Sequence, residues 1–540
     1  MAEEPDPDGR ARRWWLRMAL LVLLCAPAFG AGRAATRGLS WPPGIDLYRD
    51  IAQAQTMADG ALLADPFYRG EAVWYNPLVP GLVATMAGLS GRPVHVLYVQ
   101  AGAYLNLLGP VAFFLLIEAC FGLPAAALAT LHLVYVRDPV GPPWLSPAYS
   151  PWLYGAAFVQ ALFYSTVLAY RRALQTGALG WFAGPGVLLG LTFLGHTAPA
   201  LLAGVLAAIG FAHDAGTGKG RASLVRHALI VGVAVVVAAP FLWSILLRYQ
   251  LRIRNPAPLD WVWPPMSLPS SPAFMATYVS LPGTLLAVVA LLWLVGRDPR
   301  RREASLLAAW ALGAAGFFTL SLLREGTGVG PRLVPRHHFL FYWRAAESAL
   351  LGYGGAALLA LGGRLGGESL RRLAPAALVL AVAAAVAARF PSYREREAFT
   401  AGRRDAERDD SRLNRQEARE WIRAHSASDD VFLAADDLAL MIVGPAGRKV
   451  VALDAYFSNP YVDWQARHAA RDAMVADLCE GRFAELAARG KALGVGFIIH
   501  KRSDRWGPDD APVLRREFTN ARIGIFRFVE TPDPPLAMGR

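Results

Sequence analysis

The sequence predicts an α-helical polytopic membrane domain followed by a soluble α/β domain. Of its 540 residues, 54% are hydrophobic and 18% are charged. Apolar stretches of membrane-spanning length recur from Trp14 to about Phe390. Residues 392–410 are instead dense in Arg, Asp and Glu, and no later window is suited to spanning. We therefore expect a membrane domain over residues 1–390 and a second domain over 391–540.

Basic clusters at the ends of apolar segments set the expected order of helices, because Lys and Arg are retained on the cytoplasmic side. A first helix at about 14–32 leads to a long external loop at 34–91, in which 77–89 is partly inserted. Ten more crossings bring the total to about eleven, and they place the C-terminal domain outside. These crossings are expected at about 94–118, 122–137, 152–170, 179–194, 197–212, 227–247, 273–295, 304–323, 339–362 and 374–389.

The soluble part has the mixed pattern of an α/β domain. Helical periodicity covers 414–424 and 474–488. Short buried strands are expected at 431–434, 449–453, 495–500 and 523–529. This part shows no Gly-rich phosphate loop, no nucleophile elbow and no metal-ligand cluster, so we place the chemistry in the membrane domain.

Composition excludes some classes of protein. The net charge of +12 lies largely at helix ends, and no nucleic-acid-binding motif accompanies it. The three cysteines are scattered without metal-type spacing, and a disulfide framework is not expected.

The external loop at 34–91 carries five carboxylates and ends in Trp74-Tyr75-Asn76-Pro77-Leu78. Asp46 is the candidate general base, because it follows the first helix closely and an ionised carboxylate there can accept a proton. Asp50, one helical turn further on, is the nearest competitor. The alternative role for Asp46 is to cap the helix expected at 47–57. We expect a helix stop at Asp59-Gly60 and a turn at Asp65-Pro66.

A candidate anion site lies in the segment Arg332-Leu-Val-Pro-Arg336-His337-His338. Arginine binds phosphate through paired hydrogen bonds, and a helix start beside it also favours anions. We expect Arg336 to be exposed on the external side; the alternative for Arg332 and Arg336 is a rim charge. Arg344 is a further phosphate-binding candidate inside a membrane helix. Its alternative is an internal pair with Glu347, three residues on.

Two other polar groups are expected on the external side. His196, at the turn between two helices, could face the site or simply hydrogen-bond to backbone. Trp261 and Trp263 could stack on a sugar or form part of the interfacial aromatic belt, and the belt is the interpretation we favour.

Together these features resemble the GT-C superfamily of membrane glycosyltransferases, especially bacterial relatives of protein O-mannosyltransferases and aminoarabinose transferases. The resemblance is carried by GIDLYRD and ADPFYRGEAVWYNPLVPGL in the first external loop, and by GLTFLGHTAP. It also includes the basic loop before a late helix and the EWIR segment at Glu420–Arg423.

This resemblance implies an inverting enzyme that uses a sugar carried on polyprenyl phosphate. Asp46 would act on the acceptor hydroxyl, and Arg332, Arg336 and His337 would hold the lipid phosphate. The acceptor would be a lipid, a glycan or a protein. Related enzymes often have a second acidic residue, for which Asp50 and Asp138 are equal candidates. Arginine alone can meet the phosphate charge, so no metal is expected to be required, although a divalent metal stays open.

The expected location is the bacterial inner membrane, with Asp46, His196, Arg336 and residues 392–540 on the periplasmic side. Residues 300–302 are expected on the cytoplasmic side. The competing function is a non-catalytic membrane protein, either a transporter of lipid-linked glycans or a degenerate scaffold. A transporter should show paired repeats and broken midplane helices. No internal repeat is evident, so the sequence favours an enzyme.

Overall fold

The computed structural model describes residues 7–136, 142–146, 148–276, 281–297, 302–365, 367–409, 411–504 and 511–529. The chain divides into two compact units. The first consists of Met1–Ser40, Val99–Ala239 and Asp260–Arg403, and the second of Trp41–Tyr98, Pro240–Leu259 and Arg404–Arg540. The second unit therefore groups most of the first external loop and a segment after residue 239 with the C-terminal part of the chain.

The expected polytopic helical fold is confirmed. In the described part of the chain, seven helices are long and apolar enough to cross a membrane: Arg10–Thr36, Val94–Phe121, Thr197–Gly216, Gly220–Arg248, Glu303–Thr327, His337–Gly362 and Arg372–Arg408. Shorter apolar helices lie at Leu78–Ser90, Leu123–Val136, Leu179–Gly195 and Pro282–Gly296. Three expected crossings, at 122–137, 179–194 and 273–295, thus correspond to shorter helices. The segment expected at 152–170 forms α7 (Gly155–Thr176).

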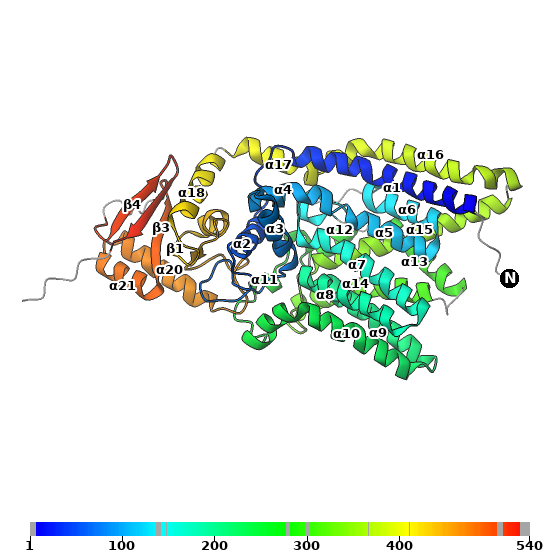
Figure 1. The fold of residues 1–540 in the computed structure, drawn as a ribbon, viewed down its shortest axis with the longest axis horizontal. Helices are drawn as coiled ribbons and strands as arrows, with labels where there is room; N and C mark the ends of the chain where they lie inside the picture. The colour runs from blue at the N-terminus through cyan, green and yellow to red at the C-terminus, as the bar shows by residue number, and fades with distance from the viewer. Residues whose placement is uncertain are drawn as a thin grey trace, which may run out of the picture. The chain divides into compact units, whose positions relative to one another are not determined.

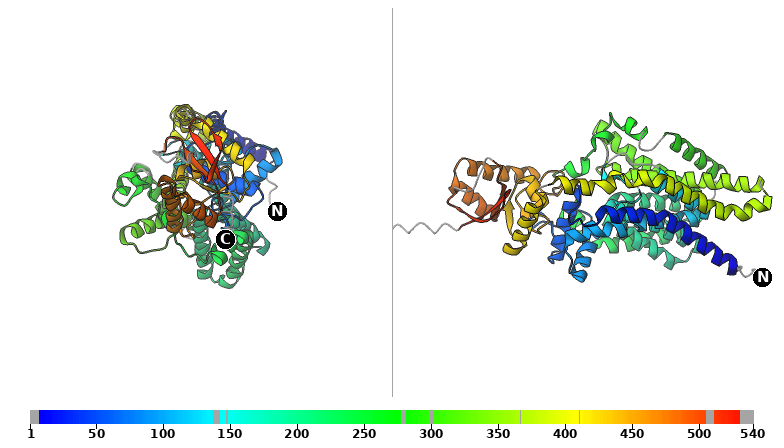
Figure 2. Two further views of the ribbon diagram at one scale, coloured as in Figure 1. Left: turned by 90° about the vertical axis from the view of Figure 1, so that its left-hand side faces the viewer. Right: turned by 90° about the horizontal axis from the view of Figure 1, so that it is seen from above.

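The first unit is a helical bundle (Figure 1). Its main helices are α1 (Pro7–Thr36), α5 (Leu108–Phe121), α6 (Leu123–Leu131), α7, α8 (Ala183–Gly195), α9 (Thr197–Gly216), α10 (Gly220–Leu242), α13 (Leu281–Arg297), α14 (Arg302–Thr327), α15 (His337–Leu365) and α16 (Gly367–Arg394). Helices α1 and α16 lie side by side (Figures 1 and 2). Small residues allow close packing: a Cβ added at Gly352 of α15 would lie 2.5 Å from the Ala125 carbonyl of α6.

The second unit contains α2 (Asp46–Ala58) and α3 (Leu78–Ser90) from the first loop. α4 (Val94–Leu105) begins in this unit. Its C-terminal part has α18 (Arg412–His425), α20 (Trp464–Cys479) and α21 (Phe483–Leu493) around one five-stranded sheet of order β2-β1-β3-β5-β4. The strands are β1 (Val431–Leu433), β2 (Lys449–Val450), β3 (Val495–Lys501), β4 (Leu514–Thr519) and β5 (Ile523–Phe528). Strands β2, β1 and β3 are parallel, whereas β5 is antiparallel to β3 and β4.

The expected α/β character is confirmed, with two corrections. The single helix expected at 474–488 is two helices, because the chain turns at Gly481, whose φ of 69° favours glycine. Strand β4 was not expected. Its Arg515, Arg516 and Glu517 interrupt the apolar pattern because it is an edge strand, which carries charge readily.

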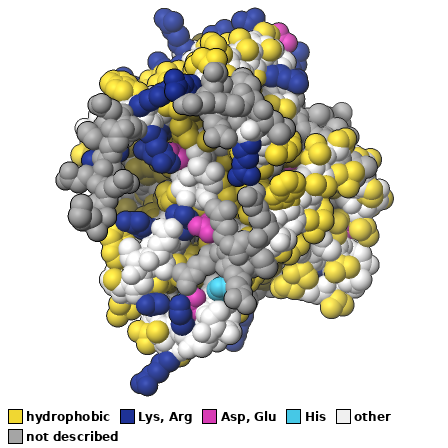
Figure 3. Space-filling view, turned by 90° about the vertical axis from the view of Figure 1, so that its right-hand side faces the viewer, with side chains coloured by type: hydrophobic (Ala, Val, Ile, Leu, Met, Phe, Trp, Pro, Cys, Tyr) yellow, Lys and Arg dark blue, Asp and Glu magenta, His cyan; other side chains and the backbone are white. Residues whose placement is uncertain are grey.

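Basic side chains remain solvent-exposed at several helix ends. Figure 3 shows Lys and Arg side chains at separate places on one face of the molecule, with few acidic ones among them. Exposed basic residues at or near helix ends include Arg12, Arg172, Arg221 and Arg372. This distribution is the one on which the expected membrane orientation rests.

Candidate active site: a carboxylate cluster and an arginine–histidine cluster

The carboxylate cluster, which consists of Asp46 and Asp50, lies in the second unit on the first turns of α2. Helix α2 begins at Asp46, and its N-cap position is Ile45. No side chain caps this end, so Asp46 is not the N-cap that the alternative interpretation required. Asp50, one turn later, is buried and accepts hydrogen bonds at Oδ1 from Arg49 Nε (3.0 Å) and NH2 (2.8 Å). The Arg49 guanidinium also lies 3.7 Å from the centre of the Tyr75 ring.

These contacts distinguish the two candidate bases. Both arginine hydrogen bonds go to Asp50, which is thereby held in a charge-assisted pair. Asp46 is half-buried, and its interaction with Arg49 is coulombic. Burial raises the pKa of the Asp46 carboxyl above its ordinary value, and Arg49 opposes that shift. Burial also raises the pKa of Asp50, again against the effect of Arg49. Perturbed carboxylates of this kind are common at functional sites.

The other three carboxylates of the loop bind residues of the C-terminal part. Asp59 is the C-cap residue of α2, as expected of a helix stop, and it pairs with Arg423 and Arg448. The Asp65 carboxylate accepts the backbone N–H groups of Phe67 and Tyr68, which makes the expected turn. Asp65 also binds Asn459, and Glu71 pairs with Arg467. These partners give Asp59, Asp65 and Glu71 structural roles.

The arginine–histidine cluster lies in the first unit, where α15 begins at His337. It consists of Arg336, His337, His338 and His196. Arg336, directly before the helix, is only 2% exposed and donates from NH2 to Glu325 of α14. Its remaining buried donors, Nε and NH1, have no hydrogen-bond partner among the residues that the structure describes. The expectation that Arg336 is exposed is therefore wrong. A buried guanidinium with unmatched donors carries a large free-energy cost unless an anion completes it.

Aromatic rings surround this helix start. The centre of the His337 ring lies 4.9 Å from the ring centre of Trp144, 5.2 Å from that of Trp261 and 3.9 Å from that of His338. The ring centre of His338 in turn lies 4.2 Å from the ring centre of His196. His196 is the N-cap of α9 and accepts the Ala198 N–H at 3.2 Å, which is the backbone hydrogen bond named as its alternative role. His196 is thus both a helix cap and part of this cluster.

Two arginines that were predicted to bind phosphate pair with carboxylates instead. Arg332 donates from Nε to Asp260 Oδ2 at 2.9 Å, and both side chains are partly exposed, as in the rim-charge alternative. Arg344 donates to Glu347 at 2.7 Å, and both side chains are 2% exposed. This is the internal pair named as the alternative for Arg344, although the Arg344 NH2 group has no hydrogen-bond partner in the described part of the chain. Of the predicted arginines, Arg336 is the one best suited to hold an anion.

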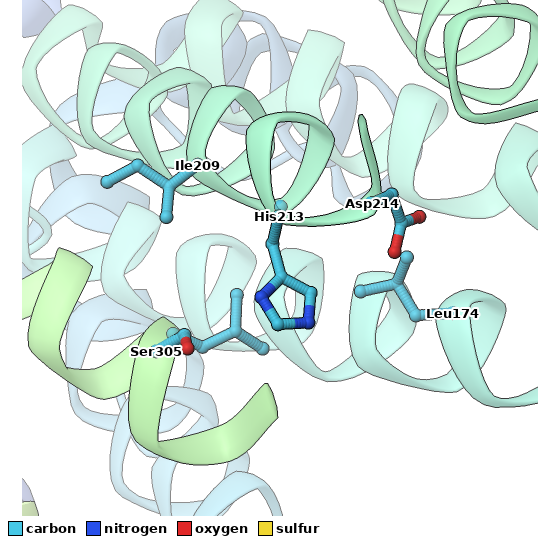
Figure 4. Close-up of a pocket in the computed structure, with 7 residues that line it drawn as sticks. Leu174, Ile209, His213, Asp214 and Ser305 are labelled. Carbon is cyan, nitrogen blue, oxygen red and sulfur yellow. The ribbon is translucent and has the colours of Figure 1, made fainter. Parts of the chain in front are cut away.

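Other candidate features are less suited to chemistry. Among the residues that the structure describes, no group of three or more His, Cys, Asp or Glu side chains is placed to hold a metal ion. Asp138 lies outside the described residues. A cavity beside His213, Asp214 and Ser305 has a volume of about 20 Å³ (Figure 4). A water needs roughly 10–15 Å³, so this cavity is far too small for a sugar.

Sequence reasoning missed the residues that orient the candidates. Arg49 and Glu325 are ordinary charged residues in sequence, and their roles come from contacts to Asp50 and Arg336. Glu325 lies only eleven positions before Arg336, so its proximity in the sequence was an available signal. Trp144 gave no comparable signal, because its contacts to Trp261 and His337 join distant parts of the chain.

Comparison with solved structures gives the fold. ArnT from Cupriavidus metallidurans, bound to undecaprenyl phosphate, matches with a TM-score of 0.57 and 14% identity over 94% of this chain and 97% of that one. The archaeal oligosaccharyltransferase AglB from Archaeoglobus fulgidus, in complex with an inhibitory peptide and a dolichol-phosphate, also has a TM-score of 0.57 and 14% identity. That match covers 97% of this chain and 75% of AglB.

A third match is the arabinofuranosyltransferase AftD from Mycobacteria, with a TM-score of 0.54 and 14% identity over 96% of this chain and 40% of AftD. No family model and no curated protein sequence matches. The chain therefore has the fold of the GT-C membrane glycosyltransferases, as its sequence resemblance indicated. It is a multi-pass membrane protein of that fold.

Proposed function

We propose that this protein is an inverting glycosyltransferase that moves a sugar from a polyprenyl-phosphate donor to a hydroxyl acceptor at the periplasmic face of the membrane. The observation that carries the proposal is the buried Arg336, whose Nε and NH1 donors are unmatched. Each of these N–H donors can make a charge-assisted hydrogen bond to an anion oxygen such as that of a phosphate. The similar ArnT and AglB structures contain undecaprenyl phosphate and dolichol-phosphate, which supports a lipid phosphate as the ligand.

The proposed reaction uses residues of both clusters. Asp46 takes the proton of the acceptor hydroxyl as its oxygen attacks the anomeric carbon. The bond from that carbon to the phosphate oxygen breaks, and the electron pair leaves with the lipid phosphate. Arg336 stabilises the charge that develops on this phosphate, while Glu325 fixes the guanidinium. Attack from the opposite side of the sugar inverts the anomeric centre. Asp50, paired with Arg49, helps to set the charge around Asp46.

The direct test is transfer of a radiolabelled sugar from a panel of polyprenyl-phosphate sugars by the purified protein, with lipid, glycan and peptide acceptors. Formation of product with release of polyprenyl phosphate supports the enzyme. Movement of a lipid-linked sugar across a vesicle membrane without release of polyprenyl phosphate supports the competing transporter. Lipid-phosphate binding with neither activity supports a degenerate scaffold.

As the pH is lowered, we expect transfer to decline at a higher pH than an ordinary aspartate would cause, because burial raises the pKa of Asp46. The base must be ionised, so transfer rises as pH increases through this pKa. The effect of pH on stability has the opposite sign to its effect on transfer. Because the raised pKa in the folded state favours the neutral carboxyl, Asp46 and Asp50 favour the fold at low pH, and this contribution is lost as the pH rises through their folded pKa. Rates and melting temperatures from about pH 8 down to pH 4 should show transfer lost before the fold. Loss of both in parallel would contradict this.

We also expect a defined orientation in the membrane. Single cysteines at the exposed positions Leu62, Val329 and Leu413 should react with an impermeant thiol reagent on intact spheroplasts, whereas one at Arg221 should not. The background should lack the three free cysteines, Cys25, Cys120 and Cys479. Labelling at Arg221 but not at Leu62 would place both clusters in the cytoplasm, where nucleotide sugars would be the donors.

A further inference from the structure

We infer that the C-terminal part of the second unit, Arg404–Arg540, positions the loop that carries Asp46, and that Asn459 is its central positioning residue. The catalytic consequence rests on the proposed function, whereas the contacts do not. We refer to residues 59–73 as the docked segment. This segment follows α2 directly and is tied to the C-terminal part along its length.

The main attachment is at Asp65, which is fully buried. Its Oδ2 accepts a hydrogen bond from Asn459 Nδ2 at 3.0 Å, and its backbone carbonyl accepts one from Lys449 Nζ at 2.6 Å. Burial raises the pKa of Asp65, but the N–H donors of Phe67 and Tyr68 favour its charged form. A buried carboxylate needs all of these donors, so removing one leaves an unmatched acceptor.

Asn459 also joins a third segment of the chain. Its Nδ2 lies 3.0 Å from the hydroxyl oxygen of Tyr249, which accepts the Ala72 N–H at 2.8 Å. The Tyr249 ring stacks on Tyr461 with ring centres 4.8 Å apart. The backbone N–H groups of Arg254 and Asn255 both donate to the Pro460 carbonyl. Residues 249–255 and the docked segment are therefore fixed against the same C-terminal turn.

A second attachment lies next to the start of α2. The Arg419 guanidinium of α18 is 3.5 Å from the centre of the Trp41 ring, and Trp41 donates from Nε1 to Gln416 at 2.7 Å. Trp41 stacks on Tyr48, which lies two residues after Asp46. Helix α2 is thus held at its start through Trp41 and at its end through Asp59, which pairs with Arg423 and Arg448.

This arrangement predicts a separation of effects. A misplacement of about 1 Å can cost roughly 10²-fold in rate, because proton transfer requires a defined geometry. Arg336 lies in the other unit, so undocking the loop should slow transfer with little change in phosphate affinity. A purely structural role for Asn459 would instead lower the melting temperature and leave the mobility of α2 unchanged.

The test compares Asn459→Ala with the exchange Asp65→Asn plus Asn459→Asp in the full-length protein. The exchanged pair can form the same hydrogen bond with donor and acceptor reversed, and the amide oxygen introduced at position 65 can still accept the two backbone N–H groups. Three quantities should be measured: hydrogen exchange over 46–73, affinity for undecaprenyl phosphate without sugar, and the rate of transfer. Asp477→Asn is the matched control, because the buried Asp477 accepts its hydrogen bonds from Arg482 and Arg489.

We expect Asn459→Ala to speed exchange in α2 and the docked segment and to slow transfer roughly tenfold or more, with lipid-phosphate affinity changed less than about twofold. The exchanged pair should restore both quantities, and Asp477→Asn should change neither. Unchanged exchange in α2, or no rescue by the exchanged pair, would overturn the inference. If Asn459→Ala does not fold, Tyr249→Phe removes one hydroxyl and gives the same comparison. Hydrogen exchange needs no substrate, so it decides the inference even if the wild-type protein transfers no sugar.

Discussion

Replacement of Asp46 by Asn should lower the rate of transfer by roughly 10²–10⁴-fold, the usual contribution of a general base. Asn keeps the size of the side chain but cannot take the acceptor proton. The charge lost is half-buried and has a raised pKa, so folding should be preserved or slightly improved. The measurement is single-turnover transfer with saturating donor, together with the melting temperature.

Two variants make this result specific. Asp472→Asn removes a carboxylate that is 65% exposed on α20, and it should leave transfer unchanged. Asp50→Asn breaks the pair with Arg49 and should reduce transfer less than Asp46→Asn does. Wild-type transfer by the Asp46 variant, together with inactivity of the Asp50 variant, would move the role of base to Asp50.

Loss of Arg336 should weaken binding of the donor phosphate by roughly 10- to 100-fold, since a hydrogen bond to a charged group contributes about 1.5–3 kcal/mol. Because the buried Arg336 pairs with Glu325, the single change to Ala would also leave the Glu325 carboxylate without its arginine partner and destabilise the fold. The informative variant is therefore Arg336→Ala combined with Glu325→Gln. Affinity for undecaprenyl phosphate and melting temperature should be measured for both.

The controls separate a phosphate ligand from a structural arginine. Glu325→Gln alone keeps Arg336 and should retain lipid-phosphate affinity. Arg332→Ala removes a partly exposed ion pair with Asp260, which contributes little in water, and should change affinity much less. Unchanged affinity in the double variant, with a large fall in melting temperature, would assign Arg336 a structural role.

The sequence predicted those features that depend on local pattern. Helix positions follow from apolar length and periodicity: the helix expected at 47–57 begins at Asp46, and the one expected at about 339–362 begins at His337. Strand β4 was not predicted because edge strands tolerate charge. The break between α20 and α21 at Gly481 was not predicted because the neighbouring residues suit a helix. The membrane-spanning segments were the most predictable elements because a bilayer requires a long apolar run.

The candidate site was less predictable, because side-chain partners are not local in sequence. Asp46 and Asp50 have the same chemistry and similar surroundings in the sequence, but Asp50 is buried and paired with Arg49, whereas Asp46 is half-buried. Arg332 and Arg336 lie four residues apart, yet one pairs at the surface with Asp260 and the other is buried beside Glu325. Burial decided both differences, and it depends on contacts with other parts of the chain that a local pattern does not report.

The docking of the first loop also imposes an order on biogenesis. Asp65 and its partner Asn459 are 394 residues apart, so the loop must leave the membrane insertion machinery long before its partner is synthesised. At roughly 5–20 residues per second, the wait is about 20–80 s. During this interval the Asp65 carboxylate has its local N–H donors from Phe67 and Tyr68 but lacks Asn459, and its backbone carbonyl lacks Lys449. With the orientation proposed above, a nascent chain arrested before residue 459 should be cleaved by periplasmic proteases within 59–73, whereas the finished protein should resist. Export of the C-terminal part would then be the step that completes the fold of the loop.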